Sequence, residues 1–433
     1  MERIENPPMS KWSQILQRPT QKLEAIEATV SAIFSEIESR GDVAVAKYTQ
    51  LFDGVSPDTI LVSDDELDNA SRQISEDLKR AIKLAYDNIN RFHIAQKTAP
   101  VAVETQPGVH CWQEKRPIEK VGLYIPGGSA PLFSTILMLA IPASIAGCSE
   151  IILCTPPAKD GTINPAMLYT AQLCGVRKIY KVGGIQAIGA MTFGTTEIPK
   201  VYKIFGPGNQ YVTVAKQLAT KHGVAIDMPA GPSELLVFAD ETANPAFVAS
   251  DLLSQAEHGA DSQVILVTTS RKTIDDVTAE IEIQLSELPR EEIARKAMAN
   301  SKLIFVSDNE TALRLINEYG PEHFIVVAKD EQYFVENILN AGSVFIGNYT
   351  PESAGDYASG TNHTLPTNGY AKQYSGVNLD SFNKSITFQK ISAPGLELIG
   401  GAVEQMAEAE GLQAHKNAVS IRLRQISKAK KNQ

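Results

Sequence analysis

The sequence contains few cysteines and no long hydrophobic run, and each shortage excludes a class of protein. Its four cysteines form neither a CxxC pair nor the dense pattern of a disulfide-rich domain, so reduced, buried thiols are expected. The most apolar stretch, ILMLAIPASIAG, is shorter than a membrane span and is interrupted by Pro142. The first residues, MERIENPPMSKW, lack the basic and then apolar pattern of a signal peptide. We therefore expect a cytoplasmic protein that does not associate with a membrane.

Positive charge is also scarce. The chain has 40 Lys and Arg against 50 Asp and Glu, which gives a formal net charge of −10, and its basic run is the terminal KAKK at 428–431. Such a balance disfavours binding to nucleic acid or to anionic lipid. Apolar residues, in contrast, are plentiful: 433 residues of which 43% are hydrophobic suffice for two or more folded domains. The composition therefore predicts a globular protein without a nucleic-acid partner.

The hydrophobic pattern changes along the chain and predicts an α/β fold. Residues 1 to about 105 carry apolar residues at helical spacing, which predicts helices that cover a core built elsewhere. From 118 to about 350, short apolar runs alternate with helical windows, as in βα units around mainly parallel sheets. These runs are too many for one compact doubly wound unit, so we expect two sheets with a break near 226–234. They are KVGLYI, EIILCT, KIYKVG, VYKIFG, ELLVFA, QVILVT, KLIFVS, FIVVAK and SVFIGN.

The end of the chain has a different pattern. After about 350, some thirty polar and glycine-rich residues show no periodicity, and a loop of that length in a compact enzyme is usually functional. A strand-like SITFQKIS and two helical segments follow. These changes suggest four parts: an N-terminal helical region (1–105), a first α/β domain on the side of the cofactor (106–232), a second α/β domain with the metal and catalytic residues (233–375), and a C-terminal helical tail (376–433).

Three glycine-rich loops follow predicted strands, but none completes a nucleotide-binding fingerprint. They are IPGGSAP, VGGIQAIGAM and FGPGNQYV. Open α/β sheets bind ligands at the carboxyl ends of their strands, where glycine lets a phosphate approach the backbone. However, FGPGNQYV has Tyr211 where the dinucleotide motif requires its third glycine, and GIQAIGAM lacks the lysine of a phosphate loop. From these loops alone, nucleotide binding and ordinary βα turns both remain open.

A helix is predicted to end within the segment SQAEHGADSQ, and its last turn carries two potential metal ligands, Gln255 and His258. Asn244 is suited to the N-cap, Pro245 to the first helical position, and Gly259 to the stop. Gln255 and His258 stand three residues apart, so both side chains project from one face of the last turn. An amide oxygen and an imidazole nitrogen can therefore face one point in space.

Histidine is scarce, and its placement is informative. Of the seven histidines, His93, His110 and His222 lie in helical or turn contexts and are expected to be structural. The other four lie near carboxylates or amides, an arrangement that suits a metal such as zinc, which accepts nitrogen and oxygen ligands and leaves a position for substrate. Singly each has a structural interpretation, but together they favour a shared site. The pairs are Gln255 and His258, Glu322 and His323, Asp356 and His363, and Glu410 and His415.

The segment GPEHF places an acid beside a base. Gly320 and Pro321 are expected to end a helix and Phe324 to begin a buried strand, so Glu322 and His323 stand at the amino end of that strand. At a frayed strand start both side chains can turn toward one cleft. The alternative is a strand-edge pair in solvent.

Seven segments together resemble histidinol dehydrogenase, in the same order and from about residue 20 to the C-terminal helix. They are GLYIPGGSAPLFST, FGPGNQYVTVAK, DMPAGPSELLV, SQAEHGADSQ, GPEHF, AGDYASGTNHTLPT and AEAEGLQAHKNAV. The resemblance implies two incomplete Rossmann-like domains, similar to aldehyde dehydrogenases, in a homodimer. It also implies an NAD-dependent oxidation of L-histidinol to L-histidine through L-histidinaldehyde, in the last steps of histidine biosynthesis, with one zinc ion per subunit.

The resemblance also assigns site residues. It implies that His323 takes the alcohol proton and that Glu322 activates water against the aldehyde. Zinc would orient the substrate, and the partner subunit's tail would supply one ligand. The implied zinc ligands are Gln255, His258, Asp356 and His415. The implied substrate contacts are these four with Ser233, His323, His363 and Glu410, and the implied cofactor contacts are Tyr124, Gln186 and Asn209.

Three other functions compete with this one. The nearest is a related zinc and NAD dehydrogenase that acts on a different amino or hydroxy alcohol, although Glu410 suits the ammonium group of histidinol. An aldehyde dehydrogenase-like enzyme with a catalytic thiol would lose turnover when Cys111 and Cys148 are replaced by alanine. A non-enzymatic zinc protein would have a closed metal shell and no use for the pair Glu322 and His323.

Overall fold

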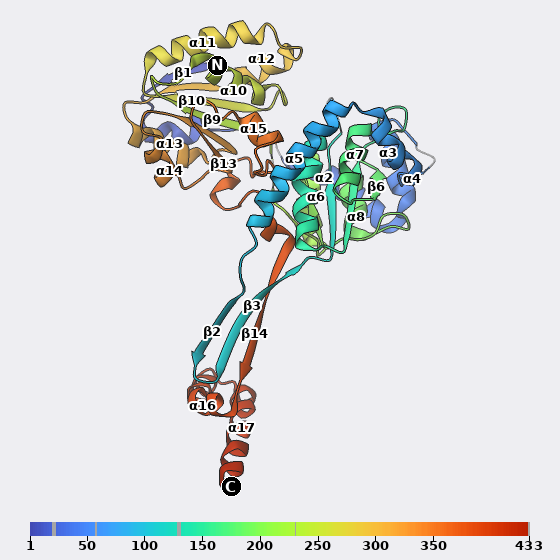
Figure 1. Ribbon diagram of the computed structural model, residues 1–433, viewed down its shortest axis with the longest axis vertical. Helices are drawn as coiled ribbons and strands as arrows, with labels where there is room; N and C mark the ends of the chain where they lie inside the picture. The colour runs from blue at the N-terminus through green and yellow to red at the C-terminus, as the bar shows by residue number, and fades with distance from the viewer. Residues whose placement is uncertain (20–22, 57–58, 128–130, 230, 432–433) are drawn as a thin grey trace. The chain divides into compact units, whose positions relative to one another are not determined.

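A computed structural model describes residues 1–19, 23–56, 59–127, 131–229 and 231–431 (Figure 1). Residues 128–130 of the predicted loop IPGGSAP, and residue 230 in the predicted break between the sheets, lie outside this range. The chain forms two compact units. The larger comprises Met1–Gln96 and Ile118–Phe382, and the smaller comprises Lys97–Pro117 and Asn383–Gln433.

The first half of the larger unit contains a parallel sheet whose strands, within the described residues, have the order β6-β5-β4-β7-β8. The sheet is predominantly apolar, because helices pack on it and its strands are buried on both faces. The strands are β4 (Lys120–Tyr124), β5 (Glu150–Thr155), β6 (Lys178–Lys181), β7 (Lys203–Phe205) and β8 (Ala225–Ile226). The connecting helices are α6 (Phe133–Ala146), α7 (Pro165–Leu173), α8 (Gly184–Phe193) and α9 (Gln210–Lys221).

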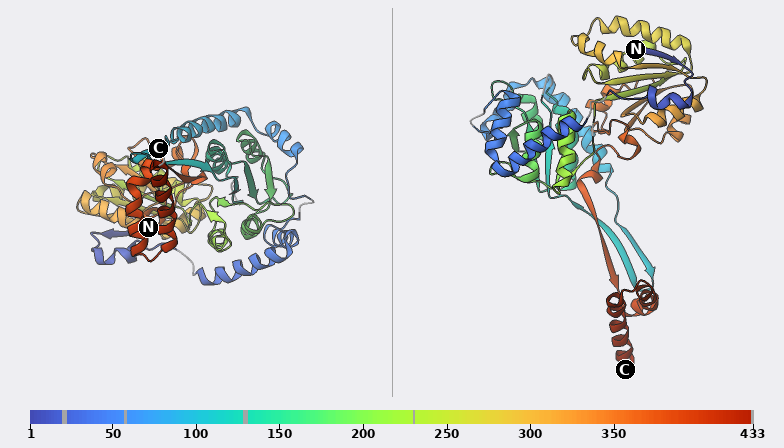
Figure 2. Two further views of the ribbon diagram at one scale, coloured as in Figure 1. Left: turned by 90° about the horizontal axis from the view of Figure 1, so that it is seen from below. Right: turned by 180° about the vertical axis from the view of Figure 1, so that it is seen from behind.

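Helices α2 to α5 form an outer layer on this half, whereas α1 packs on the second sheet described below. Helix α2 packs against α8 and α9, α3 against α8, α4 against α7, and α5 against α6 (Figure 2). The prediction that these helices cover a core built elsewhere is therefore confirmed. The elements are α1 (Trp12–Ile15), α2 (Leu23–Arg40), α3 (Asp42–Asp53), α4 (Asp64–Ala70) and α5 (Glu76–Ala95), with short 3-10 turns at Met9–Lys11 and Ser71–Gln73.

The second half of the larger unit contains a second parallel sheet, of order β1-β11-β10-β9-β12-β13 within the described residues. Helices α10, α11 and α12 cover one face, and α1, α13 and α14 cover the other (Figure 1). Its strands are β1 (Glu2–Glu5), β9 (Glu234–Ala239), β10 (Gln263–Thr268), β11 (Lys302–Phe305), β12 (His323–Val327) and β13 (Ser343–Ile346). Its helices are α10 (Pro245–Ala256), α11 (Arg271–Leu285), α12 (Glu291–Ala299), α13 (Asn309–Tyr319), α14 (Glu331–Asn337) and α15 (Glu352–Tyr357).

The nine apolar runs are all strands, and the change of sheet falls between β8 and β9, as predicted. The two-sheet α/β fold class is thus confirmed. The description of residues 1–105 as helical was incomplete, because β1 and β2 (Val101–Gln106) are strands. Strand β1 spans four largely exposed residues, ERIE, and is too short to show an alternating pattern. It pairs with β11, so a partner about 300 residues away decides its conformation.

The smaller unit is an antiparallel sheet of β2, β3 (Val109–Pro117) and β14 (Asn383–Ile391), followed by α16 (Ala393–Ala409) and α17 (Gln413–Lys431). The predicted strand SITFQKIS and both predicted helices are confirmed. This unit buries few of its apolar side chains. Leu398, Met406 and Ile421 are 59%, 65% and 58% exposed.

The polar segment after β13 connects the two sheets of the larger unit. Within it, α15 and the turns Tyr370–Lys372 and Leu379–Phe382 are the regular elements among the described residues. Asn362 donates to the carbonyl oxygen of Met138 on α6, and the backbone N–H of Asn368 donates to the carboxylate of Glu234 on β9. Among the described residues, no helix combines the length and the apolar composition that a membrane crossing requires.

Candidate active site and metal centre

The candidate site is built on the amino ends of two adjacent central strands of the second sheet. Strands β9 and β12 run parallel with His323 opposite Leu235, so Glu234 and His323 begin neighbouring strands. Helix α10 returns to this end of the sheet. Its N-cap is Asn244, as predicted, and the side chain of Asn244 accepts from the N–H of Ala246. The helix ends at Ala256, earlier than the predicted stop at Gly259, so Gln255 lies in its last turn and His258 in the turn that follows.

Glu322 and His323 face the same buried point, as the sequence suggested. Glu322 is 7% exposed and His323 is 3% exposed, which excludes the solvent-edge alternative. The carboxylate oxygen Oε2 of Glu322 lies 3.6 Å from Nδ1 of His323 and accepts the N–H of Glu234 at 2.9 Å. His323 Nδ1 lies 3.2 Å from the carbonyl oxygen of Glu234 and 3.1 Å from the side-chain amide nitrogen of Gln255. The tautomer that donates to this carbonyl keeps a lone pair on Nε2, as a base requires.

A potential metal site lies on the Nε2 side of His323. Ligand atoms of His258, Glu352 and Asp356 all lie within 4.8 Å of one another. Gln255 is 1% exposed, and its Nε2 donates to the carbonyl oxygen of Glu234 at 3.3 Å, which leaves its Oε1 for another partner. Among the described residues, buried atoms without a hydrogen-bond partner include Gln255 Oε1, His323 Nε2, Glu352 Oε2 and Asp356 Oδ1, although His323 Nε2 and Asp356 Oδ1 lie 3.5 Å apart as a potential ion pair.

These atoms fit a divalent cation. Buried carboxylate and amide oxygens are costly when they have no partner, and a cation that accepts nitrogen and oxygen ligands would satisfy them together. Of the predicted zinc ligands, the structure brings His258 and Asp356 together and places Gln255 against His323, where its Nε2 lies 3.1 Å from the ring Nδ1. The donor set suits zinc, since an imidazole nitrogen and hard oxygens are present without a thiolate.

Glu352 was missed by the sequence analysis. It lies four residues before Asp356 on α15, so both carboxylates project from one face of the helix. It is 1% exposed. The six-residue helix is too short to show a periodic pattern in a polar segment, although the spacing of the two acids in PESAGDY was a usable signal.

The surrounding charges favour cationic ligands. Burial acts to lower the pKa of His323, but the charges of Glu352 and Glu322 outweigh it and raise this pKa well above its ordinary value. Burial raises the pKa of Glu352, whereas contacts with His323 and His363 overcome burial and lower the pKa of Asp356. The buried carboxylates would therefore be stabilised by a positive charge, such as that of a metal ion or an ammonium group.

Ser233 and His363 line a small cavity of about 60 Å³ that Glu322 also lines. His363 is held in place, because its Nδ1 lies 2.7 Å from the backbone oxygen of Asp356 and its Nε2 lies 3.1 Å from Thr135 Oγ1. Burial lowers the pKa of His363, which favours the neutral ring. Two of the predicted substrate residues and one predicted catalytic residue thus surround one space.

A larger cavity of about 940 Å³ lies at the carboxyl ends of β4, β5 and β7, and Tyr124 and Asn209 line it. Asn209 is the N-cap of α9, and the Tyr124 hydroxyl accepts the N–H of Gly184 at 3.2 Å. Gln186 is fully buried and donates to Asp53, which lines the cavity. The cavity combines strand carboxyl ends with the N-terminus of α9, an arrangement that binds phosphates.

The loop FGPGN beside this cavity owes its shape to Gly206. A Cβ atom there would collide with the carbonyl oxygen of Tyr124, and its φ of +131° also favours glycine. The buried pair Lys216 and Asp227 fixes the loop, since Lys216 Nζ donates to the oxygen of Gly206 and Asp227 accepts its N–H, both at 2.8 Å. This glycine therefore serves a close backbone approach, whatever it contributes to ligand binding.

Glu410 and His415 lie in the smaller unit, Glu410 at the end of α16 and His415 on α17, and both are exposed. The three histidines expected to be structural have structural contacts. His93 is buried beside the oxygen of Ile89, His222 packs against Phe34 and Phe193, and His110 lies beside Glu104 at the surface. All four cysteines are free thiols.

Asp251 on α10 carries a prediction about stability. Burial raises its pKa to about 7, so the folded state disfavours the carboxylate above the unfolded pKa near 4. Stability contributed by this group is therefore lost as the pH rises from about 4 through about 7. We expect the free energy of unfolding of Asp251→Asn, relative to that of the wild type, to be about 2 kcal/mol higher at pH 8 than at pH 5. Denaturant unfolding of both proteins at each pH measures it. Equal differences at both pH values would contradict this.

The chain is similar to known proteins over nearly its whole length. A family model described as histidinol dehydrogenase matches residues 16–423. A histidinol dehydrogenase from Bacteroides thetaiotaomicron is 58% identical over 423 residues, which cover 98% of this chain and 99% of the relative. One from Aliivibrio fischeri is 53% identical over 421 residues, covering 96% and 95%. A crystal structure of histidinol dehydrogenase from Elizabethkingia anophelis matches with a TM-score of 0.96 and 56% identity, covering 99% of each chain.

Proposed function

This chain belongs to the histidinol dehydrogenase family, and from that premise we propose that it oxidises L-histidinol to L-histidine through L-histidinaldehyde in four electrons, in the last steps of histidine biosynthesis. The observation that carries the proposal is the 58% identity over nearly the full chain. The buried pair Glu322 and His323 beside a cluster of potential ligand atoms without hydrogen-bond partners supports it. A cytoplasmic location follows from the biosynthetic role.

Zinc is the metal that we propose for the site, one ion per subunit. Gln255, His258 and Asp356 would hold it, with His415 as a fourth ligand and Glu352 close by. Its chemistry would be to bind nitrogen atoms of the substrate and so to fix the substrate beside the bases. Ser233, His363 and Glu410 would contact the rest of the substrate, with Glu410 suited to its ammonium group.

NAD is the proposed oxidant, held in the large cavity by Tyr124, Asn209 and Gln186. Burial raises the pKa of Tyr124 to about 12, so its hydroxyl stays protonated and can donate to the cofactor. NAD would accept a hydride in each of the two oxidation steps. The volume of about 940 Å³ is consistent with a ligand of this size.

The chain's own residues would move the protons. The carboxylates that raise the pKa of His323 would be offset by a bound cation, and the neutral ring, through the lone pair on Nε2, would then remove the proton of the substrate alcohol. Glu322 would remove a proton from water as that water adds to the aldehyde carbon. Both bases are buried, so the reactive aldehyde is shielded from bulk water between the two steps.

We propose a homodimer in which the smaller unit packs on the partner subunit and places His415 and Glu410 in its site. The exposed apolar side chains Leu398, Met406 and Ile421 support this, because a surface of that kind is normally covered by protein. The partner that fits is a second copy of the chain, since the family resemblance gives Glu410 and His415 of the smaller unit roles in a site that is built on the larger unit.

The nearest competing function is a zinc and NAD dehydrogenase for a different amino or hydroxy alcohol, which a substrate panel would separate. A catalytic thiol is disfavoured, because burial raises the pKa of Cys148 to about 11 and would keep that thiol protonated. A non-enzymatic zinc protein is also disfavoured, because burying Glu322 and His323 costs stability that such a protein would have no reason to lose.

The function is tested by the NADH formed per L-histidinol consumed, with zinc present and after chelation. We expect two NADH per histidinol, loss of activity on chelation, and recovery with zinc. No NADH from histidinol in protein that retains zinc would mean that the substrate is another alcohol. Two NADH per histidinol in fully metal-free protein would contradict the metal site.

Glu352 provides a test of the metal site that does not depend on turnover. We expect Glu352→Gln to weaken zinc binding about tenfold, because the variant removes a buried negative charge next to the ligands. Competition with a chelator of known affinity measures the effect. The matched control is Glu257→Gln at the C-cap of α10, which removes the same charge. An equal loss of zinc affinity in both variants would contradict a direct contribution of Glu352 to the metal site.

A further inference from the structure

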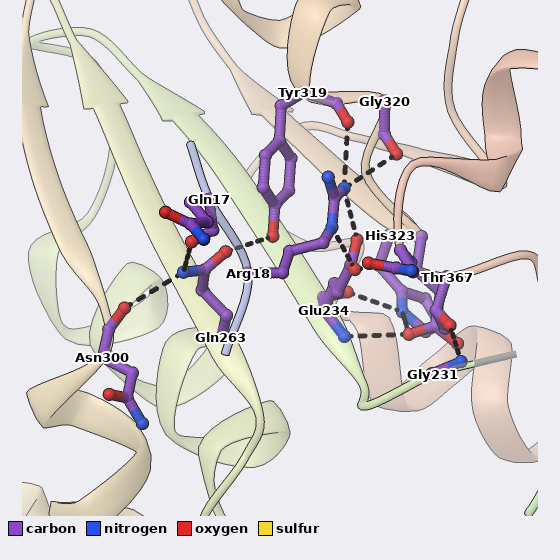
Figure 3. Close-up of polar contacts among 12 residues, drawn as sticks. Gln17, Arg18, Gly231, Glu234, Gln263, Asn300, Tyr319, Gly320, His323 and Thr367 are labelled. Atoms are coloured by element: carbon purple, nitrogen blue, oxygen red, sulfur yellow. Dashed lines mark hydrogen bonds and ion pairs between the residues drawn. The ribbon is translucent and has the colours of Figure 1, made fainter. Parts of the chain in front are cut away.

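A buried ion pair between Arg18 and Glu234 lies next to the catalytic pair and has no part in the mechanism above (Figure 3). Arg18 Nη2 donates to Glu234 Oε2 at 2.8 Å, and Arg18 Nε donates to the other carboxylate oxygen. The two side chains are only 14% and 2% exposed. Arginine in such a bidentate pair fixes the direction of the carboxylate as well as its charge.

Arg18 also holds the turn from which Glu322 emerges. Its Nη2 donates to the carbonyl oxygens of Tyr319 at 2.9 Å and Gly320 at 3.4 Å, and its guanidinium lies 4.0 Å above the ring of Tyr319. Those two carbonyls end α13, and only Pro321 separates them from Glu322. Figure 3 shows the guanidinium between this turn and the carboxylate of Glu234. One side chain therefore connects the helix end before the catalytic pair to the start of β9.

The backbone of Glu234 contacts both catalytic residues. Its N–H donates to Glu322 Oε2 at 2.9 Å, and its carbonyl oxygen lies 3.2 Å from His323 Nδ1. The carboxylate of Glu234 is held by Arg18 and also by the N–H of Asn368, which donates to Oε1 at 2.6 Å. Because the side chain is held at two points, the peptide groups on either side of residue 234 have little freedom to rotate.

We propose that Arg18 and Glu234 are positioning residues, which orient the peptide groups of residue 234 so that Nδ1 of His323 carries the proton and one oxygen of Glu322 stays free for water. This inference rests on the proposed function for the roles of Glu322 and His323. In the hydrogen bonds described, Arg18 contacts none of the proposed metal ligands, whereas the carbonyl oxygen of Glu234 also accepts from Gln255 Nε2 at 3.3 Å.

A purely structural role would give a different result. In that case the pair would only tie the segment before α2 to the second sheet, and its loss would lower stability without changing the chemistry of correctly folded protein. The single variants leave one buried charge without a partner and can unfold for that reason. The double variant Arg18→Gln/Glu234→Gln removes both charges, keeps the side-chain size at position 234 and leaves a shorter polar side chain at position 18, so it is the main test.

The experiment compares Glu234→Gln, the double variant and the control Arg271→Gln, all as zinc-loaded full-length protein. Arg271 pairs with Glu5 at the surface and lies outside the site. The ¹⁵N chemical shifts of the His323 imidazole, assigned with His323→Gln, report the tautomer of the neutral ring without any need for turnover. Steady-state kinetics with histidinol and the NADH formed per histidinol report the two oxidation steps.

We expect the double variant to stay folded, to lose the single Nδ1–H tautomer, and to show a kcat lower by about 10–100-fold with a KM for histidinol within about threefold of wild type. NADH per histidinol should fall below two as aldehyde escapes. An unchanged tautomer in the folded double variant would overturn the inference, even if activity fell. If wild-type protein does not oxidise histidinol, the proposed function fails, and the tautomer comparison still decides the role of the pair.

Discussion

Glu322→Gln should convert the protein into an enzyme that carries out the first oxidation and fails at the second. His323 is intact in this variant and still takes the alcohol proton, but a neutral amide cannot accept a proton from water as a carboxylate does. The glutamine has the same size as the glutamate and can still accept the N–H of Glu234, so the local structure should persist. We expect overall turnover to histidine to fall by about 10²–10⁴-fold.

The measurement is a rapid-mixing experiment that follows NADH. Wild-type protein should form two NADH per site, whereas Glu322→Gln should show a burst of about one NADH per site followed by a slow phase, with histidinaldehyde trapped by a carbonyl reagent. His323→Gln is the matched control, and it should lack the burst because it loses the base of the first step. A Glu322→Gln enzyme that still forms histidine at the wild-type rate would refute the assignment of Glu322.

Two inactive variants should restore activity to each other when they are mixed as subunits. If His415 of one subunit completes the site of the other, a mixed dimer of His323→Ala and His415→Ala has one site with both defects and one site with none. Random exchange at equal amounts makes about half of the dimers mixed, and half of their sites are intact. We therefore expect recovery of about one quarter of the wild-type activity.

The control is a mixture of His323→Ala with Glu322→Gln, in which both defects belong to the same part of the chain. Each site of that mixed dimer retains one defect, so its activity should not exceed that of the separate variants. Exchange is verified by mass spectrometry of differently tagged subunits. Proven exchange of His323→Ala with His415→Ala without recovery would mean that each subunit uses its own tail.

The sequence by itself determined the two-sheet α/β fold, because a strand buried on both faces must be apolar throughout, and nine such runs are visible without any knowledge of their partners. It also determined the N-cap of α10 at Asn244 and, to within three residues, its end, since caps and stops are local signals. The ordered segments around Glu322, His323 and Asp356 were sufficient to indicate the family, which the comparisons establish.

Tertiary structure alone decided which residues from distant parts of the chain meet. Glu352 became a candidate for the metal site only when α15 was seen beside α10. Arg18 and Glu234 are 216 residues apart, and no local sequence pattern around either residue predicts their ion pair. Strand β1 is polar and short, and it exists because β11 offers it a free edge. Hydrophobic periodicity reports which face of an element is buried, but a charged side chain finds its partner only through the packing of whole elements.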